Sequence, residues 1–242
     1  LGDVYKRQVK NLNLDIEAGE FVTMLGPSGS GKTTCLMMLA GFETATHGEI
    51  ELGGKPINNI PPHKRGIGMV FQNYALFPHM TVEENLTFPL KVRTMSKGEI
   101  NEKVLRALDM VQMRAFADRK PAQLSGGQQQ MLGLAMALHT APKVLMIDEL
   151  SLGLAPAVVE RILPVIKQIA ANGTAVIIVE QSVNLALTIA ERAYFMEKGK
   201  IRFSGATKDL LERPDLLRSV FLSKVETAPI QIAHTSGPAS EI

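Results

Sequence analysis

The chain has 242 residues, a formal net charge of +2 and one cysteine, Cys35. The small net charge predicts no strong field for nucleic acid, so we expect no nucleic-acid partner, and a single cysteine excludes an internal disulfide. Hydrophobic residues make up 45% of the chain and aromatic residues only 5%, which favours an aliphatic core of helices on a sheet. No apolar run approaches the ~20 residues needed to span a bilayer.

The first fifty residues predict short strands around one glycine-rich loop. Residues 1–8 lack an initiator Met and resemble translated sequencing-adapter sequence, so we interpret them as non-native, with an ordinary first strand as the alternative. Residues 11–16 alternate polar and apolar side chains, as a half-buried strand does. Residues 48–54 indicate another short strand and a turn.

The glycine-rich loop matches the pattern G-x-x-x-x-G-K-T of nucleotide hydrolases. An apolar, strand-like stretch precedes it and a helix that stops at Gly41 follows it, which is the context that this pattern needs. Backbone N–H groups and Lys32 are expected to bind the phosphates, and the Thr33 hydroxyl to bind Mg²⁺. The predicted nucleotide-binding residues are Gly26, Pro27, Ser28, Gly29, Ser30, Gly31, Lys32, Thr33 and Thr34. A glycine-rich turn that meets the pattern by chance is the alternative.

The middle of the chain is mainly helical. Residues 81–84 and 96–99 both carry a capping-box pattern typical of a helix start. Apolar residues at helical spacing predict a packing face, made of Ile100, Val104, Leu108 and Val111. Ser125 begins a further helix, which runs to Leu138. We interpret about residues 73–138 as a helical subdomain.

Strands and helices alternate outside that segment. Residues 66–71, 144–147 and 175–179 predict buried strands, residues 156–171 a helix, and residues 193–203 a hairpin. A helix to about residue 191 follows the third strand, two short helices lie around residues 210 and 217, and residues 224–242 form a tail. The alternation indicates an α/β fold with a mostly parallel sheet, an antiparallel β edge, and a site at the carboxyl ends of the strands.

Polar residues that follow the apolar strands are candidates for chemistry. Asp148 closes one strand, where a Mg²⁺-linked carboxylate is expected, and the adjacent Glu149 is the candidate general base for an attacking water. A solvent-facing acidic turn is the alternative. A helix start at Ser125, Gly126, Gly127 and Gln128 offers N–H groups and a hydroxyl to a second anion. Because the chain already has a phosphate loop, we expect this segment to face the nucleotide of another subunit.

Together and in this order, the phosphate loop, Gln72 at a strand end, Leu-Ser-Gly-Gly-Gln and Leu-Met-Ile-Asp-Glu resemble the ATP-binding subunit of ABC transporters. The resemblance covers about residues 9–222 and implies a P-loop NTPase fold, with one ATPase domain over residues 9–223. It implies ATP and Mg²⁺ as ligands, with Thr33, Gln72 and Asp148 at the metal. It also implies a head-to-tail pair of ATPase subunits, a transmembrane permease partner, and a peripheral location at the cytoplasmic face of the inner membrane.

The two halves of the chain resemble different importers. Residues 9–130 are similar to the ATPases of polyamine and sugar importers, and residues 131–222 to an ATPase of branched-chain amino-acid importers. Leu150 replaces the family's usual proline, the common aspartate is absent around Ala155, and Gln181 stands at the catalytic switch position, where histidine is usual. Glutamine can hydrogen-bond a γ-phosphate without carrying charge, so we expect a heterodimer with a histidine-bearing partner rather than a dead enzyme.

These features predict an ATP-hydrolysing subunit of a bacterial importer, with branched-chain amino acids as the expected substrate. A polyamine- or sugar-type importer is one alternative, and a chimera of two genes without a single native function is another. A soluble ABC ATPase without a permease is a third, but such proteins usually carry two cassettes or long inserted arms.

Overall fold

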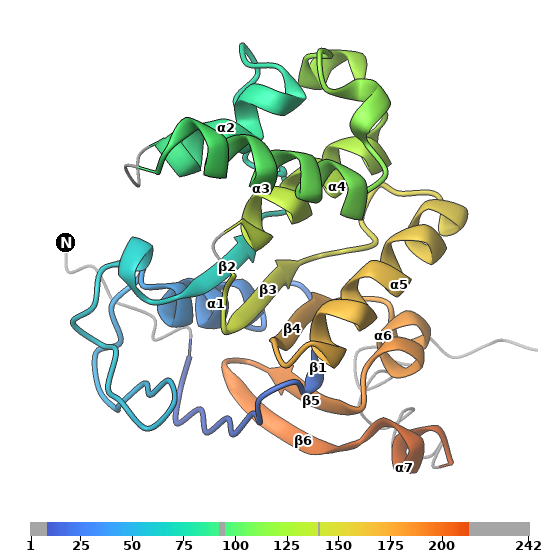
Figure 1. Cartoon of the computed structure of the whole chain (residues 1–242). Helices are drawn as coiled ribbons and strands as arrows, with labels where there is room; N and C mark the ends of the chain where they lie inside the picture. Colours follow the sequence, from blue (N-terminus) through green and yellow to red (C-terminus); the bar gives the residue numbers. More distant parts are fainter. Residues whose placement is uncertain (1–8, 92–94, 140, 213–242) are drawn as a thin grey trace, which may run out of the picture.

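In the computed structural model, residues 9–91, 95–139 and 141–212 are described. They form a six-stranded sheet with the order β2-β3-β4-β1-β5-β6 (Figure 1). The strands are β1 (Phe21–Leu25), β2 (Ile67–Val70), β3 (Val144–Asp148), β4 (Ala175–Glu180), β5 (Arg192–Glu197) and β6 (Lys200–Ala206). Strands β1 to β5 pair in parallel, and β6 pairs antiparallel with β5. The predicted mostly parallel sheet with an antiparallel edge is confirmed.

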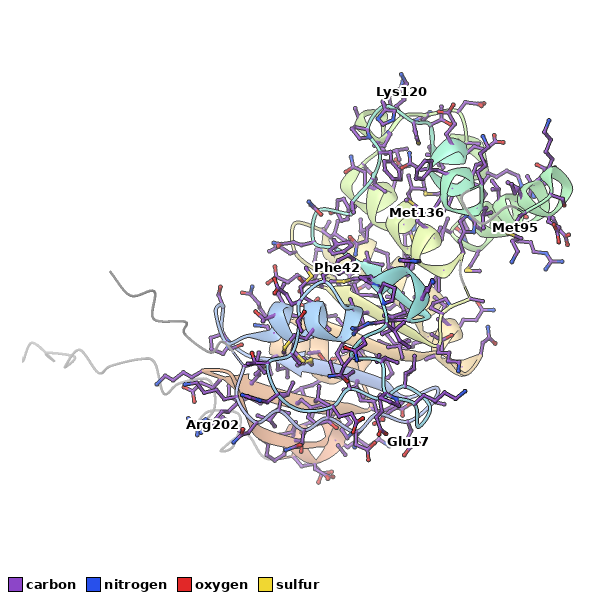
Figure 2. The ribbon with its side chains drawn as sticks, turned by 90° about the vertical axis from the view of Figure 1, so that its left-hand side faces the viewer. Glu17, Phe42, Met95, Lys120, Met136 and Arg202 are labelled. Carbon is purple, nitrogen blue, oxygen red and sulfur yellow. The ribbon has the colours of Figure 1, made fainter. Side chains whose placement is uncertain are left out.

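Helices cover both faces of this sheet and extend beyond one end of it (Figure 1). They are α1 (Lys32–Ala40), α2 (Val82–Lys91), α3 (Lys97–Met110), α4 (Gly126–Leu138), α5 (Pro156–Ala171), α6 (Val183–Ile189) and α7 (Thr207–Leu211). Short 3-10 turns lie at Pro62–Lys64, Arg114–Phe116 and Pro121–Gln123. Figure 2, turned by 90°, places Lys120 of the helical part and Arg202 of β6 at opposite ends of the molecule.

Alternate residues of the central strands pack against helices on opposite faces. On one face, Met146 and Ile177 belong to a buried cluster with Leu36 of α1. On the other, Ile147 and Ile178 belong to a cluster that includes Ile162 and other residues of α5. This two-residue period explains why these strands are continuous apolar runs, since both of their faces are buried.

The helical part has a core of its own. The predicted packing face is buried, as Ile100, Val104, Leu108 and Val111 all lie in one apolar cluster with residues of α2 and α4. Ser96 caps α3 through the predicted capping box, and Ser125, where the sequence predicts only a helix start, caps α4 through a capping box as well. The fully buried Asn85 of α2 ties the preceding loop down, accepting from Phe77 N at 2.8 Å and donating to Thr81 O at 2.8 Å.

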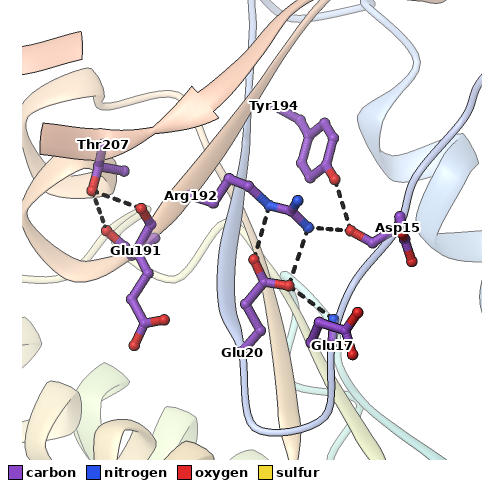
Figure 3. Close-up of polar contacts among 8 residues, drawn as sticks. Asp15, Glu17, Glu20, Glu191, Arg192, Tyr194 and Thr207 are labelled. Carbon is purple, nitrogen blue, oxygen red and sulfur yellow. Dashed lines mark hydrogen bonds and ion pairs between the residues drawn. The ribbon is translucent and has the colours of Figure 1, made fainter. Parts of the chain in front are cut away.

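Two expected strands are absent from the described residues. Residues 11–16 form no strand, and in residues 48–54 only one isolated bridge forms, between Glu51 and Pro56. Side chains of β5 hold the first segment instead: Arg192 and Tyr194 both donate to the Asp15 carbonyl, and Arg192 pairs with Glu20 at 2.8 Å (Figure 3). Helix α6 ends at Ile189, two residues short of its predicted end.

The predicted non-native residues 1–8, the short helix around residue 217 and the tail over residues 224–242 lie outside the described residues. Over the part of the chain that the structure describes, no helix is both long and apolar enough to cross a bilayer.

His139, just after α4, makes stability depend on pH. Its side chain is only 8% exposed, and burial, with the Lys103 charge, lowers its pKa from 6.5 to about 4. In the unfolded chain His139 is protonated below about pH 6.5, whereas in the folded chain it is protonated only below about pH 4. The free energy of unfolding therefore falls as the pH falls through this window. We expect His139→Gln to lose less of its Tm than wild type between pH 7.5 and 5.5.

The matched control is His63→Gln, because His63 is exposed in the 3-10 turn before β2. It should show the wild-type pH dependence in the same thermal scans. An identical pH dependence for His139→Gln and wild type would contradict the assignment.

Candidate functional site

The glycine-rich loop leaves β1 at Leu25 and enters α1 at Lys32 with a tightly wound backbone. Gly26, Gly29 and Gly31 have φ values of 152°, 74° and 100°, which glycine adopts without strain. A Cβ added to Gly26 would lie 2.1 Å from the Met196 carbonyl of β5, whereas Gly29 meets nothing within 4 Å. The loop is therefore packed hard against the sheet at Gly26 and open at Gly29, as a cradle for a ligand must be.

Lys32 bends back over this loop. Its ammonium donates to the Gly26 carbonyl at 2.7 Å and the Pro27 carbonyl at 3.0 Å, and the residue is only 5% exposed. Burial lowers the pKa of Lys32, while the nearby carboxylates of Glu149 and Asp148 act in the opposite direction. A buried cation thus lies inside the loop, with two carboxylates near enough to affect its protonation.

Asp148, at the end of β3, lies against the first turn of α1. The Thr33 hydroxyl donates to the Asp148 carboxylate at 3.3 Å. Burial raises the pKa of Asp148, and the hydrogen bond from Thr33 opposes that rise. The two oxygen groups that sequence reasoning placed at one metal, though 115 residues apart in the chain, are therefore neighbours.

Glu149 and Gln181 are also in contact. The Gln181 amide donates to the Glu149 carboxylate, and the Glu149 backbone N–H donates to the Val179 carbonyl at 2.9 Å. Glu149 has a φ of 56°, a left-handed conformation that costs a non-glycine residue about 1–3 kcal/mol. The sequence predicted both residues at the site, but not that one would hold the other.

Two predicted parts of the site, Gln72 and residues 125–128, are not among the partners of these hydrogen bonds. Gln72 is exposed and lies two residues beyond the end of β2. Because β2 pairs in parallel with β3, Gln72 lies at the same end of the sheet as Asp148. Ser125 caps α4, accepting from Gln128 N at 3.3 Å, and a Cβ added to Gly127 would lie 2.3 Å from Val158 of α5. Ser125 and Gly126 remain exposed, so a facing role for this segment towards another subunit stays a prediction.

Two residues that sequence reasoning gave no role adjoin the site. Glu180, the last residue of β4, is 2% exposed, and its carboxylate accepts from Ser151 N at 2.8 Å and Ser151 Oγ at 2.9 Å. One sequence signal could have identified Glu180: it ends an otherwise apolar strand. A carboxylate buried in that position needs hydrogen-bond donors nearby.

These donor and acceptor groups fit a nucleotide and a divalent cation. Among residues 9–91, 95–139 and 141–212, no group of three or more His, Cys, Asp or Glu side chains could hold a metal. That fits Mg²⁺, which usually binds through one or two protein carboxylates together with substrate phosphates rather than in an all-protein cage. Thr33 and Asp148 offer the two neighbouring oxygens, and the open loop with Lys32 offers the phosphate contacts.

A buried strand, a glycine loop closed over a lysine and a helix that begins at that lysine define a phosphate-loop nucleotide-binding protein. The ABC transporter family matches residues 9–151, more than half of the chain. The chain therefore belongs to the ABC transporter family, in which it is an ATP-binding domain, and the family resemblance drawn from its sequence is confirmed.

Relatives and solved structures agree with this family. The chain is 43% identical over 250 residues to the spermidine/putrescine import ATP-binding protein PotA of Pseudomonas fluorescens, covering 96% of this chain and 66% of that protein. It is 43% identical to PotA of Vibrio cholerae over 86% of this chain and 56% of that protein. The chain thus spans between about half and two thirds of these relatives' lengths. A dimeric ATP-binding cassette bound to ADP and Pi matches with a TM-score of 0.77 and 32% identity, over 86% of this chain and 94% of that one.

The close approach at Gly26 gives a stability test. In Gly26→Ala, the new Cβ would overlap the Met196 carbonyl, a backbone atom that cannot move without bending β5. We expect a loss of roughly 1–3 kcal/mol or more in the free energy of unfolding, measured by urea denaturation.

The control for this test is Gly98→Ala, in α3, where an added Cβ meets nothing within 4 Å and alanine is the better helix former. That variant should be as stable as wild type or slightly more stable. Equal stability of Gly26→Ala and wild type would show that the loop is not packed as described.

Proposed function

We propose that this chain is the ATP-hydrolysing subunit of an ABC importer. One observation carries the proposal: the glycine loop and Lys32 lie beside Asp148 and Glu149, where β1 and β3 end on the same side of the sheet. This arrangement supplies phosphate contacts, a metal anchor and a carboxylate for a water in one place.

The phosphate loop would bind the nucleotide through its backbone. Residues 26–31 and the start of α1 direct N–H groups and the positive end of the helix dipole at the phosphates. Lys32 would exchange its two loop carbonyls, at 2.7 and 3.0 Å, for phosphate oxygens of higher charge. The proposed contacts extend to Thr34, the third residue of α1.

Thr33, Asp148 and Gln72 would hold Mg²⁺. When bound, this ion neutralises charge that develops on the phosphates. The Thr33 hydroxyl and the Asp148 carboxylate are preassembled at 3.3 Å, while Gln72 lies exposed beyond β2 and would reach the site from the neighbouring strand. The family resemblance implies that Gln72 would also link the site to the permease.

Glu149 would accept the proton of the attacking water. Its carboxylate accepts a hydrogen bond from the Gln181 amide, which orients it. Gln181 lies exposed at the end of β4, where its amide can turn from Glu149 towards the γ-phosphate.

A second ATPase subunit would complete each site. The exposed Ser125 and Gly126 at the start of α4, with Gly127 and Gln128, are proposed to face the nucleotide bound by that subunit, and the dimeric cassette structure supports such pairing. Gln181, at the position expected for histidine, favours a heterodimer. A transmembrane permease is the other proposed partner, and it would hold this chain as a peripheral subunit at the cytoplasmic face of the inner membrane.

Polyamine import is the better-supported transport role. The relatives described above are named for spermidine and putrescine import, and their alignments extend over at least 86% of the chain, including its second half. The branched-chain amino-acid expectation drawn from residues 131–222 gains no support from them. A chimera of two genes is still open, and a long read across codon 130 of the source DNA tests it directly.

Substrate choice can be measured in transport. We expect the chain, co-reconstituted in vesicles with a polyamine permease and binding protein, to drive ATP-dependent spermidine uptake. The matched assembly for leucine should stay inactive. Leucine uptake without spermidine uptake would reverse the choice between the two importer classes.

The assignment of Glu149 is tested by Glu149→Gln, which keeps the shape of the side chain and removes the base. We expect ATP affinity to stay near wild type while phosphate release slows by roughly 10²-fold or more. Lys32→Ala is the contrasting variant and should lose ATP binding itself. Wild-type turnover in Glu149→Gln would mean that another group activates the water.

The switch position is tested by Gln181→His. Imidazole can share a proton with the transferring phosphoryl group, so phosphate release by the isolated protein should rise, by about tenfold. Adding a histidine-bearing ATPase subunit and a permease to the wild type should also raise its activity. Full activity of the wild-type homodimer, unchanged by the substitution, would remove the reason for a heterodimer.

A further inference from the structure

Glu180 is a buried carboxylate beside the proposed active site. It ends β4 opposite Leu25 of β1, the residue before the glycine loop, and is 2% exposed. Its oxygens accept hydrogen bonds from Ser151 N at 2.8 Å, Ser151 Oγ at 2.9 Å and Gln181 N at 3.3 Å. These donors come from the two segments that flank Glu149 in space.

These contacts close a ring around Glu149. Ser151 lies two residues after Glu149, and Gln181 donates its side-chain amide to the Glu149 carboxylate. The Glu149 N–H is held by Val179 at 2.9 Å, so Glu149 is tied to the end of β4 on both sides. A residue kept at a φ of 56° persists only where its surroundings fix it, and the Glu180 contacts provide that support.

A glutamate is a costly residue at this position. Burial raises the pKa of Glu180, because removing its carboxylate from water disfavours the charged form. An apolar side chain of similar size at the end of this apolar strand would avoid that cost. What an apolar side chain cannot do is hold the Ser151 and Gln181 backbones in one fixed geometry.

We propose that Glu180 is a positioning residue that sets the orientation of the Glu149 carboxylate through Ser151 and Gln181. The inference rests on the proposed function for the role of Glu149. The hydrogen bonds of Glu180 to Ser151 and Gln181 are present in the chain without nucleotide, so they can be measured separately.

The variant Glu180→Gln keeps the size of the side chain but replaces one acceptor oxygen with an NH2 group, which cannot accept a hydrogen bond from Ser151 or Gln181. Hydrogen exchange of the nucleotide-free protein should quicken at least tenfold for the Ser151 and Gln181 amides. In ATPase assays kcat should fall about tenfold while KM stays within about twofold, because binding groups are untouched. Glu160→Gln, on the exposed side of α5, is the matched control and should change none of these values.

Ser151→Ala removes the hydroxyl donor and keeps the backbone donor, so it should shift the same readouts in the same direction but less. In the double variant, the combined effect should be smaller than the sum of the two single effects, as expected of two residues in contact. If Glu180→Gln does not fold, Ser151→Ala alone decides the matter by the exchange of its flanking amides.

Unchanged exchange at Ser151 and Gln181 in a folded Glu180→Gln protein would overturn the proposal, as would additive effects in the double variant. A parallel loss of ATP affinity and kcat would also overturn it, because it would indicate general damage. If the wild type hydrolyses no ATP, the proposed function fails, while the exchange data still show whether Glu180 ties the two segments.

Discussion

The parallel pairing of β1 with β4, and of β4 with β3, is the constraint on which the site depends. The register sets Leu25 beside Glu180 and Asp148 beside Val179. The glycine loop and the Asp148–Glu149 pair therefore both lie at the carboxyl ends of the parallel strands, although about 120 residues separate them in the chain. A slip of one residue would exchange the side chains that pack against the helices on the two faces, so the packing of both faces holds this register in place.

Within that frame, charges are arranged at close range with little access to water. Lys32 is withdrawn into its loop, and its burial is offset by the loop carbonyls and by two carboxylates nearby. Asp148 gains a hydroxyl donor from Thr33, which partly offsets its own burial. These groups are poorly solvated before any ligand arrives, so their interactions with a charged ligand would be stronger than at an open surface.

Local chemistry made much of this structure predictable. Glycines at positive φ, the capping box at Ser96, and the apolar strands are short-range signals, and each formed the expected element. Alternation over residues 11–16 predicted a strand wrongly, because strand pairing depends on a partner that lies far away in the sequence. The contacts of Glu180 with Ser151 and of Gln181 with Glu149 join segments about 30 residues apart and depend on the register, which no local pattern encodes.

The position of β1 has a consequence for how the protein is made. β1 pairs with β4 and β5, so its neighbours are synthesised about 150 residues later. The partner of β2 is β3, which begins only at residue 144. At a ribosome speed of 5–20 residues per second, β1 stays without its partners for on the order of ten seconds. The helical part, whose contacts are mostly local, can form in that interval. The nascent chain meanwhile carries an apolar strand with two unpaired edges, which makes it a candidate client for chaperones.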